Sequence, residues 1–372
     1  MKRAKAIWKL VWKVGVSGLL LLWIFHAIFI AEARRLVPAN SPPWDQLTRA
    51  DQWRLAWSHG PRELWHTLNL VDTTALAVSL VFMGMTILLG LLRWRMVLRV
   101  HGLELSLPRT AEISLVAHFF NSFLLGSTGG DLLKAYYAAR ETHHKKTESV
   151  VTVLVDRLVG LFAMLLFASL MMLPNLALLW EHRTLAALAW LVILMMVGCG
   201  LLIALSLWGG VSRTLPQARD WLRRLPKGET LERALKACRT FGRERFFLAR
   251  MLAISMVLNV FCVLQIMVLA WGLHLTISPI ALFVIVPVIV CISALPITPS
   301  GLGVRENLYV LMLAVPEIHV DPTRALSLSL LAYAGSLFWS LIGGIVYLSR
   351  RDRDHLAGMD EPEPVTEQAN RA

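Results

Sequence analysis

Residues 73–99 read TTALAVSLVFMGMTILLGLLRWRMVLR. The part 73–92 contains no charged residue and is about 20 residues long, which is the length with which an α-helix crosses the hydrocarbon core of a bilayer. Arg93, Arg95 and Arg99 follow directly, and such basic clusters favour the cytoplasmic side of a membrane. The stretch therefore predicts a transmembrane helix that ends in the cytoplasm.

Apolar runs of this kind recur along the chain. Its residues are 56% hydrophobic and only 17% charged, whereas soluble domains carry about a quarter of their residues as charges. We predict an all-α polytopic membrane protein in which 1–351 form a single transmembrane domain with about six full spans. These spans are 14–30, 73–92, 150–173, 184–208, 251–273 and 325–348. An uncleaved anchor is favoured for the first span, although 31–33 resembles a signal-peptide cleavage site.

The charges between these runs orient the predicted spans. The net charge of +12 comes from clustered Lys and Arg, so contact with lipid headgroups is favoured over nucleic-acid binding. We predict a basic cytoplasmic loop at 209–250, with a helix that lies on anionic lipid or is solvated. The tryptophan-rich segment 34–72 is predicted to be an outer loop, lying partly on the membrane or forming a small cap. We therefore expect the protein in the cytoplasmic (inner) membrane with both termini on the cytoplasmic side. The segment 352–372 is expected to be a disordered tail.

Two further apolar segments are too short to cross. The run 113–126 has basic residues on both sides, so we expect it to enter the membrane from the cytoplasm and return. The pieces 279–295 and 304–315 lie between outer flanks and are expected to enter from the opposite face. The units 73–173 and 251–348 then form an inverted repeat with two re-entrant segments, a recurring transporter design.

The break in the first re-entrant segment contains candidate site residues. Non-helical backbone inside a membrane is tolerated where protein or water meets it, and glycines let backbone amides approach an anion such as lipid phosphate. A tight turn needed only for packing is the alternative. A nucleotide loop is excluded, because Gly130 is followed by an acid and not by Lys and Ser or Thr. The candidates are Asn121, Ser127, Thr128, Gly129, Gly130, Asp131 and Lys134.

The second break and one span supply further charged candidates, since charges near hydrocarbon must be paired or face a cavity. Arg305 has the geometry to hold a phosphate bidentately, or pairs with Glu306 to cap a half-helix. Asp156 and Arg157 point to different helix faces. Arg157 is expected to bridge to Asp131 or a headgroup, or to snorkel to the surface. The candidates from the second break are Pro296, Pro299, Ser300, Gly301, Gly303, Arg305 and Glu306.

No cofactor, catalytic residue or metal site is predicted. The four cysteines, Cys199, Cys238, Cys262 and Cys291, form no CxxC motif and have no histidine at zinc-binding spacing. Three of them lie in apolar runs, so a packing role is expected.

Two motifs, in this order, resemble the lysylphosphatidylglycerol synthase transmembrane-region family, also called flippase-like. They are NSFLLGSTGGDLLKA at 121–135, followed by Asp156 and Arg157, and LPITPSGLGVRE at 295–306. The resemblance extends over about 13–351 and is to the stand-alone members, which have no synthase domain. Gly126 stands where many relatives have proline, and Asp156 where many have glutamate.

The resemblance implies a lipid flippase or transporter that moves an anionic or isoprenoid-linked lipid, and lysyl transfer is not expected. Under this reading Gly129, Gly130 and Arg305 hold the headgroup, while Asp131, Asp156, Arg157 and Glu306 form its polar path. One alternative is a membrane enzyme of lipid or glycan-lipid synthesis. Another is a non-catalytic membrane partner of a cytosolic glycosyltransferase or lipid-synthesis enzyme. The oligomeric state is left open.

Overall fold

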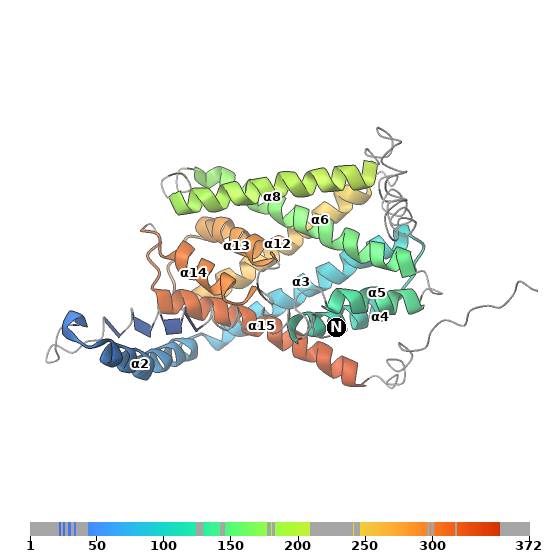
Figure 1. The fold of residues 1–372 in the computed structure, drawn as a ribbon. Helices are drawn as coiled ribbons and strands as arrows, with labels where there is room; N and C mark the ends of the chain where they lie inside the picture. The colour runs from blue at the N-terminus through green and yellow to red at the C-terminus, as the bar shows by residue number, and fades with distance from the viewer. Residues whose placement is uncertain are drawn as a thin grey trace, which may run out of the picture.

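The computed structural model is built from helices throughout the residues it describes (Figure 1). Those residues are 44–123, 129–141, 146–176, 183–208, 246–295, 301–316 and 318–349, with 22–23, 25–26, 29–30, 33–34, 180, 241 and 298. They form ten α-helices and two short 3-10 turns. The all-α class predicted from the sequence is thus confirmed for this part of the chain.

Five helices are long and apolar enough to cross a membrane. They are α3 (Thr73–Val100), α6 (Lys146–Met172), α8 (Arg183–Trp208), α12 (Phe247–Gly272) and α15 (Pro322–Ser349). Each matches a predicted span, and the expected span 14–30 lies largely outside the described residues. α6, α12 and α15 begin three or four residues before the predicted positions, and the largest error is in α3, which continues past 92 to Val100. Arg93, Arg95 and Arg99 therefore belong to the helix, because hydrogen bonding continues where the apolar run stops.

α3 packs most extensively on α12. The start of one meets the end of the other, since the Asp72 amide donates to the Gly272 carbonyl over 3.0 Å. A Cβ at Gly272 would lie 2.5 Å from the Ala75 Cβ, so the absence of a side chain permits this approach. The two helices therefore run antiparallel, and α6 and α15 pack against this pair.

Two pairs of shorter helices lie within the bundle. The first pair is α4 (Leu107–Phe123) and α5 (Gly129–Glu141), and the second is α13 (Pro279–Ser293) and α14 (Val304–Leu313). At about 1.5 Å per residue, none of the four reaches the roughly 30 Å needed to cross alone. α4 packs on α15, and α13 packs on α6. The segment expected at 113–126 is shifted, since its helix begins at Leu107 and ends at Phe123.

Much of the predicted outer loop 34–72 is the helix α2 (Arg49–Asn69), which lies at one end of the bundle (Figure 1). The Thr48 side chain caps it by accepting a hydrogen bond from the Asp51 amide. Trp53 and Trp65 are 56% and 67% exposed. The basic loop 209–250 lies mostly outside the described residues, and the tail 352–372 lies entirely outside them.

Candidate functional site

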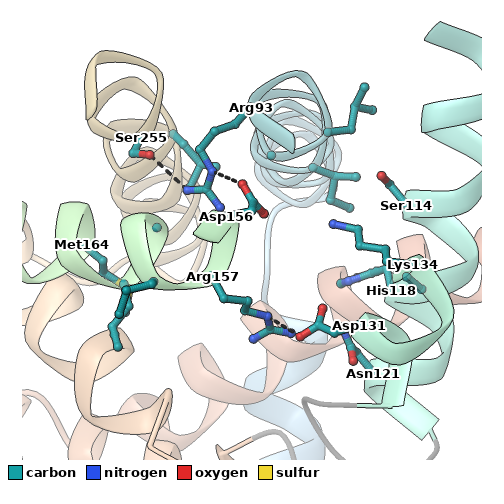
Figure 2. Close-up of a pocket in the computed structure, with 18 of the residues that line it drawn as sticks. Arg93, Ser114, His118, Asn121, Asp131, Lys134, Asp156, Arg157, Met164 and Ser255 are labelled. Carbon is teal, nitrogen blue, oxygen red and sulfur yellow. Dashed lines mark hydrogen bonds and ion pairs between the residues drawn. The ribbon is translucent and has the colours of Figure 1, made fainter. Parts of the chain in front are cut away.

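A cavity of about 690 Å³ lies between α3, α4, α5, α6 and α12. Charged and polar side chains from all five helices line it, within an otherwise apolar bundle (Figure 2). These residues are Arg93, Ser114, His118, Asn121, Asp131, Lys134, Asp156, Arg157, Ser255 and Asn259. Burying polar side chains among apolar helices costs free energy unless they are paired or meet water or a ligand. The cavity is therefore the candidate site.

Arg93 and Asp156 form a buried ion pair at one side of the cavity. The Nε atom of Arg93 donates to Asp156 Oδ1 over 2.8 Å, and its Nη1 atom donates to Ser255 Oγ over 3.0 Å. The guanidinium therefore links α3, α6 and α12. It lies against the backbone of α6, since a Cβ at Gly160 would come within 2.7 Å of both Nη atoms.

Arg157 forms the second ion pair across the cavity, where its Nε lies 2.5 Å from Asp131 Oδ2 (Figure 2). Asp131 is the third residue of α5, and a carboxylate is stabilised at a helix N-terminus by the helix dipole. The bridge to Asp131, one of the partners considered for Arg157, is therefore present. As expected for adjacent helix positions, Asp156 and Arg157 bind different partners.

Lys134 lies one turn after Asp131 on α5 and points into the cavity (Figure 2). Its Nζ atom is 4.8 Å from the centroid of the Trp94 ring, a distance typical of a cation–π contact. The carboxylates of Asp131 and Asp156 line the same cavity. Within the part of the chain that the structure describes, both carboxylates form their ion pairs with arginines, Asp156 with Arg93 and Asp131 with Arg157.

Gly130 has a packing role in the first break. Its amide donates to Asn121 Oδ1 over 2.8 Å, so Asn121 caps the start of α5 from the end of α4. A Cβ at Gly130 would lie 1.9 Å from the carbonyl oxygen of Ala117. Only glycine, which has no Cβ, avoids this clash. These contacts favour the packing alternative for Gly130, whose amide is engaged within the protein. Gly129 is buried beside it, and Ser127 and Thr128 lie outside the described residues.

The charged pair of the second break forms a separate cluster. Glu306 is fully buried, and its Oε2 accepts a 2.6 Å hydrogen bond from the amide of Gly303, which caps α14 with a φ of 84°. The Nε of Arg305 donates to Glu306 Oε1 and to Ser329 Oγ, each over 3.2 Å. These contacts correspond to the half-helix cap considered for this pair.

The cavity meets the second break at a different residue, Ala294, which follows α13. Arg305 and Glu306 are absent from the described residues that line it. Gly301, with a φ of 71°, is buried within the second break. Pro296, Pro299 and Ser300 lie outside the described residues. The structure thus gathers Asn121, Asp131, Lys134, Asp156 and Arg157 in one site and leaves the Arg305 cluster apart.

Sequence reasoning missed several residues of this site: Arg93, Ser114, His118, Gly160 and Ser255. Arg93 served only as an orientation marker, because the apolar run ends just before it. Its position two residues beyond Leu91 on a continuing helix was the signal that could have placed it inside. The small and polar residues give no such signal, since their roles depend on which helices meet.

An all-helical bundle with five long apolar helices around a charged cavity defines a multi-pass membrane protein. The profile of the lysylphosphatidylglycerol synthase TM region matches residues 52–344, and the chain belongs to this family. It is also similar to a UPF0104 membrane protein of Methanothermobacter thermautotrophicus. The two are 26% identical over 299 residues, which cover 73% of this chain and 83% of that protein. The resemblance seen in the motifs is confirmed.

Proposed function

We propose that this protein moves an anionic or isoprenoid-linked lipid across the cytoplasmic membrane. The observation that carries the proposal is the cavity, where two carboxylates and three cations meet inside a bundle of apolar helices. A lipid headgroup must leave water to cross a bilayer, and a polar cavity at membrane depth replaces the lost solvation. The acyl or isoprenoid chains remain in the surrounding hydrocarbon.

In this proposal α4–α5 and α13–α14 are re-entrant hairpins that enter from opposite faces. All four helices are too short to cross alone. The first hairpin is flanked by α3 and α6, whose basic ends face the cytoplasm under the positive-inside rule. Both termini are then cytoplasmic. The cavity touches the break of each hairpin, at Asn121 and at Ala294.

The helix contacts support an inverted repeat of α3–α6 with α12–α15. In this repeat α3, α4, α5 and α6 correspond in order to α12, α13, α14 and α15. The contact between α4 and α15 then corresponds to the contact between α13 and α6, and the contact between α5 and α6 corresponds to the contact between α14 and α15. Asp131 and Glu306 are each the third residue of the helix after the break. Inverted repeats move by rocking one unit against the other around a shared site, which would expose the cavity to each face in turn.

A reconstituted flipping assay tests this function. Purified protein in liposomes should increase the rate at which a headgroup-labelled anionic lipid becomes accessible to a membrane-impermeant quencher. Arg157→Gln should slow this rate because it leaves Asp131 without its ion-pair partner in the cavity, and Arg250→Gln is the control. Arg250 is exposed in the first turn of α12 and does not line the cavity, so its replacement should have no effect. Wild-type rates equal to those of empty liposomes would eliminate the function.

Cysteine labelling tests the topology separately. In a background without native cysteines, Thr128→Cys should react with impermeant maleimide added to the cytoplasmic side, and Ser300→Cys with reagent on the outer side. Labelling of both positions from the same side would rule out hairpins of opposite entry.

A further inference from the structure

The charges that line the cavity do not cancel. Arg93 is paired with Asp156, and Arg157 is paired with Asp131. Lys134 is the remaining cation among the described lining residues. A charge in apolar surroundings interacts strongly with any ion of opposite sign, because little water screens it. The charges of these two ion pairs and Lys134 therefore sum to +1, which one negative charge on a ligand would compensate.

The Lys134 ammonium is held in position by its surroundings. The indole of Trp94 is fully buried, and the Lys134 Nζ lies over its ring. Trp94 packs in a buried cluster with Ala135, Tyr137 and Ala138 of α5, and the Lys134 side chain is directed into the cavity (Figure 2). A cation that is already oriented loses less entropy when it binds a ligand.

Ser114 supplies a second donor beside this charge. It is 8% exposed, and it lines the same cavity from α4. Among the described residues, no hydrogen-bond partner reaches its Oγ. Buried hydroxyl groups normally have a partner, and an unpaired one that faces a cavity indicates an absent ligand or water. In Figure 2, Ser114 and Lys134 lie on the same side of the cavity.

We propose that Lys134 and Ser114 form a subsite for the phosphate of a lipid headgroup that carries one net negative charge. This inference rests on the proposed function and narrows its substrate class. A phosphodiester neutralises Lys134 and accepts a hydrogen bond from the Ser114 hydroxyl. An isoprenoid diphosphate would bring further charges for which the cavity has no free cation among its described residues, and their desolvation is costly.

Native mass spectrometry of the detergent-purified protein tests the subsite without requiring transport. The probes are dioleoyl phosphatidylglycerol, dioleoyl phosphatidylcholine, dioleoylglycerol and a polyprenyl diphosphate, each with inorganic phosphate as competitor. Phosphatidylglycerol should bind best. Lys134→Gln should weaken its binding about tenfold, the effect of losing one hydrogen bond to a charged group. Ser114→Ala should weaken it severalfold, and Lys134→Arg should retain it.

Arg250→Gln is the matched control, since it removes one positive charge away from the cavity. Equal binding of phosphatidylglycerol to wild type and Lys134→Gln would overturn the inference, as would a preference for the diphosphate. Displacement of the lipid by submillimolar inorganic phosphate would identify a site for free phosphate and also overturn it. Lys134-dependent binding together with no lipid flipping in liposomes would support the subsite and reject the transport function.

Discussion

The Arg93–Asp156 pair shows how single residues determine this cavity. Removing one partner of a buried ion pair leaves an uncompensated charge and typically costs about 3–5 kcal/mol. Arg93 also fills the space beside Gly160, where its Nη atoms would lie 2.7 Å from a Cβ. A substitution at Gly160 can therefore disrupt the ion pair although both charged residues are kept.

We predict that Gly160→Ala displaces Arg93 from Asp156 and destabilises the protein. Overpacking of this kind costs about 1–3 kcal/mol, so the midpoint of thermal unfolding in detergent should fall. Gly198→Ala is the matched control, because a Cβ at Gly198 in α8 meets no atom within 4 Å. It should leave the midpoint unchanged or raise it slightly. Equal midpoints for both variants would contradict the ion-pair geometry.

At the scale of elements, the α4–α5 hairpin depends on the contact between Asn121 and Gly130. Asn121→Ala leaves the Gly130 amide without its acceptor, which should lower the free energy of unfolding by about 1–3 kcal/mol. Gly130→Ala should reduce the yield of monodisperse protein, because its Cβ would meet the Ala117 carbonyl. Ser122→Ala is the control, since its hydroxyl donates only within α4. Unchanged stability of Asn121→Ala with weakened lipid binding would instead indicate that this contact serves the ligand.

The elements also show what the sequence could predict. Hydropathy located five spans and the pair α13–α14, because the need to match the bilayer constrains apolar length directly. For the first pair it located only α4, with shifted bounds, since α5 is not an apolar run. It misplaced the end of α3, since a helix continues through charged residues when they find partners, as Arg93 finds Asp156. The motif residues Asp131, Lys134, Asp156 and Arg157 were identified as candidates, and the bridge from Arg157 to Asp131 was among the expected alternatives. The pairing of Asp156 with Arg93 required the packing of α3 on α6.

At the scale of the whole molecule, the contact between α4 and α15 joins the two proposed repeats. The backbone of α4 approaches α15 closely, since a Cβ at Gly343 would lie 2.0 Å from the Leu115 carbonyl oxygen. His118 on α4 contacts the Ser336 carbonyl on α15 over 3.2 Å. The sequence alone does not predict this interface, because the small residues and the single histidine that form it have no recognisable spacing. If the repeats rock against each other, this is a contact that must change.

A reversible cross-link between α4 and α15 should therefore stop lipid flipping. The rings of Phe120 and Tyr347 are 5.1 Å apart, so Phe120→Cys with Tyr347→Cys can be joined by a short disulfide-containing reagent. Flipping should fall to the rate of empty liposomes and return after reduction, since rocking requires the two units to separate. Arg109 and Glu141 form an ion pair within one hairpin, and cross-linking cysteines at these positions should leave flipping unaffected. Full flipping by the cross-linked α4–α15 protein would show that the repeats do not move against each other there.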